Sequence, residues 1–226
     1  MEVIKRIRPH RGANLNIKGK AEKRLENTTS ATTFALNPDD FFGTIPKLIC
    51  KEGAQVEAGT PIFFSKKNPD IKFVSPVSGT ITAVERGPKR KIERICIAAS
   101  KTQKSVSHSV QGWEKMDREQ LKALLMESGN WPFIHQRPYG IIANPDDTPK
   151  AIFVNTVKTN PLSEDLRFVL KDDQKEFQLG IDLLNKLVDQ PIFLGTDKVQ
   201  MGYFQTVEGV QYYTVEGPHP AGNLSL

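Results

Sequence analysis

The feature that most constrains this chain is a pair of glycine-centred turns in one short region. Residues 51–64 read KEGAQVEAGTPIFF and residues 75–87 read SPVSGTITAVERG. Each turn leads into a run in which apolar and polar residues alternate, which is typical of a strand with one buried face. Gly53, Gly59 and Gly79 can adopt the positive φ that sharp turns need. Two such motifs facing each other predict a small flattened β-barrel with these turns at its corners.

The alternation also assigns side chains to the inside of this barrel. Val56 is predicted to point inward, and Ile81 and Ala83 are predicted to share one side of their strand. Short β-like runs separated by Gly, Pro and Asn continue over residues 34–100, where no stripe with helical spacing appears. We therefore expect an all-β domain over 1–100 that begins with a polar N-terminal arm.

The pattern changes after residues 101–115, a Ser- and Lys-rich stretch that we interpret as a linker. Asp117 and Gln120 have capping-box spacing, which predicts a helix that ends at Gly129. A further helix, in one or two pieces, is predicted from Ser163 toward Val188. Strands are predicted over 151–155, 191–197 and 205–217. This alternation predicts a Rossmann-like α/β domain with parallel strands over 101–226.

The bulk composition excludes several classes of protein. The chain has 226 residues and no apolar window near the roughly 18 residues that a membrane helix needs. Its first residues lack the apolar core of a secretory signal, so we expect that it neither spans a membrane nor is exported by this route. The net charge is +5, but no aromatic residues interleave the basic runs, which argues against a nucleic-acid partner. The ending, GPHPAGNLSL, lacks the polar character of a frayed terminus, and we expect a longer parent protein.

Residue types that bind metals or carry out catalysis are sparse. Cys50 and Cys96 lie in apolar runs and are predicted to be buried thiols, and without a CxxC motif they hold no zinc or iron–sulfur cluster. There is no GxGxxG motif and no Ser/His/Asp set. We therefore predict no catalytic, cofactor-binding or metal-binding residues. The histidines are also not paired at metal-ligand spacing: His10, His108, His135 and His219.

The two turn motifs resemble the lipoyl and biotinyl carrier domains, which have the barrel-sandwich hybrid fold. Those carriers hold a modified lysine at the tip of the hairpin between the motifs. Here the tip reads SKKNPDIKF, in which Lys66 and Lys67 are followed by Asn-Pro-Asp. The Met-Lys-Met of biotin carriers is absent, so we interpret both lysines as exposed turn residues.

Longer segments resemble the NqrA family, the A component of the sodium-translocating NADH:quinone reductase. The specific segments are FALNPDDFFG, KKNPDIKFVSPVSG, RGPKRK, TPKAIFVNTVKTNPLSED and GPHPAG, which together run along nearly the whole chain. The resemblance implies a barrel-sandwich hybrid followed by a Rossmann-like domain, in the N-terminal part of a protein about twice as long.

The resemblance also implies a function. Members of this family are peripheral subunits on the cytoplasmic face of the bacterial inner membrane. They belong to a translocase that uses NADH, FAD, FMN, ubiquinone and Na+. The implied partners are the membrane subunit NqrB and the subunits that carry flavin and iron. This chain would bind no cofactor itself and would contribute to assembly, with a quinone contact as a further role.

Residues 128–140, SGNWPFIHQRPYG, stand where the related subunit of respiratory complex I has its Gly-rich nucleotide loop. Rings and prolines remove the space and the backbone donors that a phosphate needs, so we expect no FMN or NADH here. Two interpretations of the stretch stay open. In the first, which we favour, the aromatic residues plug the vacated nucleotide site. In the second they contact a quinone, which needs apolar faces and a few donors; the candidates are Trp131, Phe133, His135, Arg137 and Tyr139.

Two alternatives of other classes are also open. A protein like RnfC, of the Rnf electron-transfer complex, would retain a Gly-rich nucleotide loop, and none is visible. A carrier module would hold a lipoyl or biotin group, which the intact mass would reveal.

Overall fold

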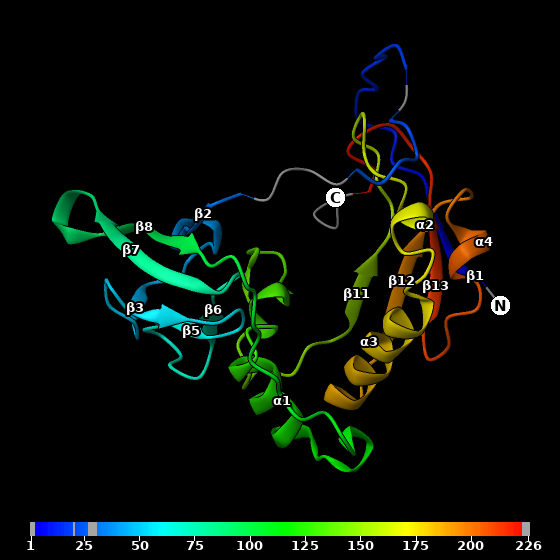
Figure 1. The fold of residues 1–226 in the computed structure, drawn as a ribbon. Coiled ribbons are helices and arrows are strands. Elements are labelled where there is room, and N and C mark those ends of the chain that lie inside the picture. The colour runs from blue at the N-terminus through cyan, green and yellow to red at the C-terminus, as the bar shows by residue number, and fades with distance from the viewer. Residues whose placement is uncertain (1–2, 20, 27–30, 223–226) are drawn as a thin grey trace. The chain divides into compact units, whose positions relative to one another are not determined.

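The computed structural model describes residues 3–19, 21–26 and 31–222, which fold into two compact units (Figure 1). One unit comprises Thr28–Asp147, and the other combines Met1–Asn27 with Thr148–Leu226. The predicted order of an all-β barrel followed by an α/β domain is confirmed. The sequence predicts a division at residue 100. In the structure, however, residues 101–147 lie with the barrel, and the N-terminal strand lies with the α/β sheet.

The barrel unit consists of two antiparallel sheets. One has the strand order β2-β8-β7-β4 and the other the order β3-β5-β6. The predicted alternation places Val56 in the core at 5% exposure, and Ile81 is fully buried. The strands are β2 (Thr33–Leu36), β3 (Pro46–Leu48), β4 (Gln55–Val56), β5 (Pro61–Ser65), β6 (Lys72–Val74), β7 (Gly79–Arg86) and β8 (Ile92–Ala99).

Aromatic stacking forms the centre of this core. The rings of Phe63 and Phe73 stack with centroids 4.4 Å apart, and Phe41 meets Phe73 edge-on at 4.6 Å. Phe63 and Phe73 are almost completely buried, and burying a side chain of this size contributes about 1.5–3 kcal/mol to the free energy of unfolding. These contacts join the short β5 and β6, which have few ladder hydrogen bonds of their own.

The glycines of the two turns act in different ways. Gly53 and Gly59 have φ of +82° and +89°, as the turn prediction requires. Gly79 has no positive φ. Instead, a Cβ at this position would lie 2.1 Å from the carbonyl oxygen of Ala98. Gly79 therefore allows β7 and β8 to approach closely where β7 begins.

Residues 101–147 pack on the barrel. Ser78 Oγ accepts a hydrogen bond from Lys104 N at 2.7 Å, and Ala58 forms an isolated parallel bridge with Ser105. The capping-box prediction is confirmed, since Asp117 and Gln120 cap each other reciprocally at the start of α1 (Arg118–Glu127). The chain then continues through the 3-10 turn η4 (Trp131–Phe133) into a hairpin of β9 (His135–Gln136) and β10 (Ile141–Ile142).

The α/β unit is built on one parallel sheet, as predicted. Its strand order is β1-β13-β12-β11, and every pairing is parallel. β1 comes from the N-terminal arm, which the sequence predicted to be an irregular part of the barrel domain. The strands are β1 (Val3–Ile7), β11 (Ile152–Asn155), β12 (Ile192–Thr196) and β13 (Gln211–Val215).

Three helices connect these strands: α2 (Leu166–Val169), α3 (Gln174–Leu187) and α4 (Met201–Phe204). The predicted helix from Ser163 is thus two helices, and its first cap is Asp165 instead of Ser163. Side chains of all three helices pack with Leu194 and Tyr212 in one core cluster, so the helices cover one face of the sheet (Figure 1).

The second face of the sheet is less covered. Phe153 on β11 stacks on Phe193 at 5.2 Å and meets Tyr213 edge-on at 6.3 Å. Phe153 is nevertheless 53% exposed, because β11 is an edge strand. The prediction that 151–155 forms a buried strand is therefore correct for the strand and wrong for its burial.

Candidate functional site

The carboxyl edge of the parallel sheet is the place to test for a ligand, because open α/β domains bind ligands outside the carboxyl ends of their strands. Here that edge carries two strand-to-helix loops. Residues 156–165 join β11 to α2, and residues 197–200 join β12 to α4. In a nucleotide-binding domain, the backbone N–H groups at such helix starts are free to meet a phosphate.

Asp165 occupies the first of these helix starts. Its Oδ1 accepts a hydrogen bond from Arg167 N at 3.0 Å, and its Oδ2 lies 2.7 Å from both Arg167 Nη2 and Lys23 Nζ. The hydrogen bonds from Arg167 and then from Lys23 hold the pKa of this carboxyl well below its usual range. The α2 start is thus occupied by a permanently charged carboxylate of the protein itself.

Asp197 binds backbone N–H groups in the loop before α4, whose N-cap is Gln200. Its Oδ1 accepts hydrogen bonds from Val199 N and Gln200 N, both at 2.7 Å. Arg167 reaches across from α2 and donates to the carbonyl oxygen of Val199 at 3.1 Å. This hydrogen bond therefore joins α2 to the second loop. Backbone N–H groups at the start of α2 and in the second loop already donate to carboxylates of the chain.

Glu216, directly after β13, completes this arrangement. It pairs with Lys198 at 3.1 Å and with Arg8 at 3.2 Å. These contacts, with Lys198 contributing most, lower the pKa of Glu216. Lys23, Arg8, Lys198 and Arg167 are the cations that could have met a phosphate at this edge, and each is paired with a carboxylate of the chain.

The C-terminal segment contacts the same edge where β11 ends. Asn155 Nδ2 donates to the carbonyl oxygen of Gly222, and Thr159 Oγ1 lies 3.0 Å from His219 Nδ1. His219 also contacts the N-terminal segment, because its backbone N–H donates to Asn14 Oδ1 at 3.2 Å.

The stretch 128–140 is the sequence-predicted counterpart of the Gly-rich nucleotide loop in the related subunit of respiratory complex I. The structure places it after α1, in the unit that contains the barrel. It joins a helix to a hairpin, so it is not a strand-to-helix loop of the parallel sheet. The expectation that its rings and prolines exclude a nucleotide stays a prediction.

The five quinone-contact candidates fall into two groups. Trp131 is buried at 6% exposure, and its indole N–H donates to the carbonyl oxygen of Ala143 at 2.8 Å, so it anchors the base of the hairpin. The other four side chains are exposed on the hairpin and its tip. Phe133 and Tyr139 are 74% and 70% exposed, and His135 and Arg137 are exposed as well. These four side chains are therefore open to solvent, whereas a quinone headgroup needs a concave site.

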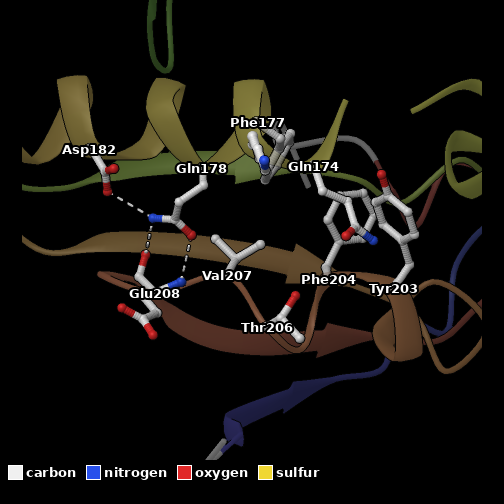
Figure 2. Close-up of a pocket in the computed structure, with 10 residues that line it drawn as sticks. Gln174, Phe177, Gln178, Asp182, Tyr203, Phe204, Thr206, Val207 and Glu208 are labelled. Atoms are coloured by element: carbon white, nitrogen blue, oxygen red, sulfur yellow. Dashed lines mark hydrogen bonds between the residues drawn. The ribbon is translucent and has the colours of Figure 1, made fainter. Parts of the chain in front are cut away.

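A pocket of about 300 Å³ lies on the α/β unit beside α3 (Figure 2). Figure 2 shows the amide of Gln178 directed at Asp182 and at the backbone of Glu208. Both ends of this amide are used, since Nε2 donates to Asp182 and to Glu208 O, and Oε1 accepts from Glu208 N at 2.9 Å. The aromatic wall, Phe177 and Phe204, belongs to the core cluster. The Gln178 amide is therefore not free to bind a ligand in this pocket.

The part of the chain that the structure describes gives no evidence for a metal site or for a reactive thiol. No group of three or more His, Cys, Asp or Glu side chains there could hold a metal ion. Cys50 and Cys96 are half-buried free thiols, where the sequence predicted full burial. Burial raises the pKa of both thiols, and Glu85 contributes further at Cys96. Among the described residues, no helix is long and apolar enough to span a membrane.

The fold defines a class of protein in which a barrel-sandwich hybrid is followed by a parallel α/β unit. In this unit, ion pairs within the chain hold the loops at the carboxyl edge of the sheet. Comparison with known families makes the class more specific. Residues 7–100 match the NqrA N-terminal barrel-sandwich hybrid domain, and residues 116–226 match the NqrA second alpha/beta domain. The chain belongs to the NqrA family.

Three relatives illustrate the extent of the similarity. Each is named as the A subunit of a Na+-translocating NADH-quinone reductase. The relative from Alcanivorax borkumensis is 30% identical over 225 residues, which cover 96% of this chain and 49% of the relative. The relatives from Histophilus somni and Rhodopirellula baltica are 32% and 33% identical over 216 residues, covering 94% of this chain and 48% and 47% of the relatives. The chain thus spans about half the length of the curated relatives it matches.

Proposed function

We propose that this chain works as the A component of a Na+-translocating NADH:quinone reductase and provides a flavin-free assembly surface in that complex. The observation that carries this proposal is the similarity along almost the whole chain to proteins of that name. On this proposal, its partners are the membrane subunit NqrB and the flavin- and iron-carrying subunits, and its place is the cytoplasmic face of the membrane. NADH, FAD, FMN, ubiquinone and Na+ are handled by the complex.

The closed sheet edge supports the flavin-free part of the proposal. A flavin or dinucleotide phosphate would have to displace Asp165 and Asp197 from the N–H groups that they accept from. It would also lie close to two carboxylates, and the repulsion between like charges disfavours binding. A domain that retained its nucleotide site would offer free N–H groups and an unpaired cation at this edge.

The hairpin of β9 and β10 supports the assembly role. Large aromatic residues are strong anchors in protein interfaces, and here Phe133, just before β9, and Tyr139, in the hairpin turn, are both exposed, as is Arg137. The base of the hairpin is fixed by buried Trp131 and its hydrogen bond to Ala143 O. An anchored hairpin that presents aromatic side chains and an arginine loses little side-chain and backbone entropy on binding.

The experiment that tests the assembly role is co-purification of the tagged chain with the membrane subunit and the flavin subunits. The double variant Phe133→Ser/Tyr139→Ser should reduce recovery of the partner subunits at least tenfold, since each anchor contributes about 2 kcal/mol or more. Ile45→Ser/Ile49→Ser is the matched control, because these two exposed apolar side chains flank β3 in the same unit. Equal recovery of the partners with the hairpin variant and the control would refute the assembly role.

A quinone contact is a second candidate function, supported by the residue types on the same hairpin. Arg137 and His135 offer donors and Phe133 offers an apolar face, but a concave site would need a second surface from a partner. We therefore expect no saturable quenching of tryptophan fluorescence when quinone is added to the chain alone. Quenching that saturates in the assembled complex and disappears with Trp131→Phe would support this function.

The flavin-free expectation has its own test. FMN added to the purified chain should show no saturable binding by flavin fluorescence, and the protein after gel filtration should lack a flavin absorbance band. Intact mass should equal that of the unmodified chain, which also tests lipoylation or biotinylation at Lys66 or Lys67. A stoichiometric flavin that survives gel filtration would contradict the interpretation of the sheet edge.

A further inference from the structure

The N-terminal segment that follows β1 is exposed along its whole described length, apart from half-buried Pro9. Residues 8–19 and 21–26 contain no helix or strand. Three large apolar side chains on it face solvent: Leu15, Ile17 and Leu25 are 65%, 53% and 73% exposed. Leaving three such side chains in water is unfavourable, so this part of the surface calls for a binding partner.

The segment is fixed to the α/β unit at two places. At the first, Ala13 N donates to the carbonyl oxygen of His219 at 2.9 Å, and His219 N donates to Asn14 Oδ1 at 3.2 Å. At the second, Lys23 Nζ pairs with Asp165 at 2.7 Å. Leu15 and Ile17 lie between these anchors, and Leu25 follows the second. The apolar side chains are therefore presented by a held loop and do not belong to a free chain end.

Basic residues surround the apolar ones. Within the described residues, Arg11 and Lys18 form no ion pair, and neither do Lys5 and Arg6 on β1. The acidic residues of the segment are Glu22 and Glu26, and both pair with Arg24, so these three side chains together carry one negative charge. The described segment contains no aromatic residue, so the stacking that single-stranded nucleic acids require is missing.

We propose that this loop, residues 11–25, binds the surface of a bilayer that contains anionic phospholipid. Leu15, Ile17 and Leu25 enter the boundary between headgroups and acyl chains, and Arg11 and Lys18 contact the lipid phosphates. Exposed apolar side chains flanked by unpaired cations are the combination that interfacial membrane segments use. The proposal does not depend on the assembly role of the hairpin, which lies in the other unit.

The test is co-sedimentation of the purified 226-residue chain with vesicles of phosphatidylcholine alone or with about 30% phosphatidylglycerol. We expect binding to the anionic vesicles only, and weaker binding in 0.5 M salt, since ionic screening reduces attraction at the surface. Arg11→Gln/Lys18→Gln should weaken partitioning about 30-fold, because each basic residue near an anionic surface contributes about fivefold. Leu15→Ser/Ile17→Ser should weaken it at least as much.

Two control variants carry the same chemical changes elsewhere. Lys66→Gln/Lys67→Gln removes two exposed charges from the barrel tip, and Phe42→Ser/Ile45→Ser removes two exposed apolar side chains. Both should bind anionic vesicles like the unaltered chain. In Leu15→Trp, the new indole should show a blue shift and quenching by brominated lipid, which reports insertion directly.

Equal binding to neutral and anionic vesicles, or an equal loss in the barrel controls, would overturn the proposal. It would also be overturned if the loop variants left vesicle binding unchanged and weakened only co-purification with other subunits. In that case the loop would be a protein contact. Because pure lipid contains no other subunit, failure here leaves the assembly proposal intact, and failure of the hairpin variants leaves this one intact.

Discussion

Replacing Asp165 should destabilise the α/β unit and leave the barrel unit unchanged. The carboxylate accepts hydrogen bonds from Arg167 N, Arg167 Nε and Arg167 Nη2, and it pairs with Lys23. Its side chain is only 20% exposed, so this pair is better shielded from water than an ordinary surface salt bridge. Asp165→Ala removes all of these contacts at once.

The expected loss in the free energy of unfolding follows from the contacts that Asp165→Ala removes. Removing an N-cap costs about 1 kcal/mol. Removing a charge-assisted hydrogen bond at a partly buried site costs about 1–2 kcal/mol more. We therefore expect Asp165→Ala to lower the free energy of unfolding by about 2–3 kcal/mol. Asp165→Asn keeps an acceptor for Arg167 N and loses the charge, so it should cost about half as much.

The two units can be followed separately by spectroscopy. Both tryptophans, Trp113 and Trp131, lie in the barrel unit, so their fluorescence reports on that unit alone. The longest helix, α3, lies in the α/β unit, so far-UV circular dichroism reports largely on that unit. In urea, Asp165→Ala should move the circular dichroism midpoint down by about 1.5 M, given a slope of about 1.5 kcal/mol per M. The fluorescence midpoint should not move.

The pH dependence of stability tests independently whether the charge of Asp165 stabilises the folded protein. The pKa of Asp165 is lowered in the folded protein, so its contribution is fully present above the ordinary aspartate pKa of about 4. It is lost as the pH falls further toward the folded-state value. The stability gap between the unaltered chain and Asp165→Asn should therefore be constant from pH 6 to 8 and shrink below about pH 4. Asp172→Asn, at an 83% exposed side chain, is the control. A gap that widens on acidification, or no gap at pH 7, would refute the reasoning.

Three further substitutions test the packing. Gly79→Ala should lower the free energy of unfolding of the barrel unit, followed by fluorescence, by about 2 kcal/mol or more, because the new Cβ would meet Ala98 O at 2.1 Å. Gly180 lies inside α3, and nothing is within 4 Å of a Cβ added there. Gly180→Ala should therefore raise the free energy of unfolding of the α/β unit, followed by circular dichroism, by about 0.5–1 kcal/mol. Trp131→Phe should cost about 1–2 kcal/mol by fluorescence of the remaining tryptophan, since Ala143 O would lose its buried donor. A destabilised Gly180→Ala, or a neutral Gly79→Ala, would contradict the local geometry.

Local signals in the sequence predicted the local structure well. The spacing of Asp117 and Gln120 fixed the start of α1, and glycines at 53 and 59 marked real positive-φ turns. The alternation around Val56 correctly assigned the inside of the barrel. Each of these features depends on residues within a few positions of one another, and a single sequence contains that information.

Long-range pairing was the main thing that the sequence did not reveal. Val3–Ile7 reads as a polar arm, yet it forms β1 and pairs in parallel with Gln211–Val215. Such a pairing joins segments from opposite ends of the chain and leaves no local pattern. Residues 101–147 group with the barrel by their contacts, whereas the family's second alpha/beta domain begins at residue 116, directly after the predicted linker.

The candidate site was predicted only in part. The lack of a Gly-rich loop in the sequence predicts that the chain binds no nucleotide, and this stays a prediction. The useful signal lay in two aspartates that follow consecutive strands. Asp165 is the N-cap of α2, and Asp197 lies in the loop before α4, where it accepts hydrogen bonds from Val199 N and Gln200 N.

The closure of the sheet edge and the exposure of the N-terminal loop have one structural cause. Because β1 adds to β13 in parallel, the chain leaves β1 at the carboxyl edge, next to Glu216 and Asp165. Arg8 and Lys23 then neutralise these carboxylates, and the residues between them must run across the outside of the unit. The added strand therefore fills the edge with internal ion pairs and at the same time displays Leu15 and Ile17 to solvent. The same added strand thus accounts both for the ion pairs at the sheet edge and for the exposed apolar side chains on which the lipid-binding proposal rests.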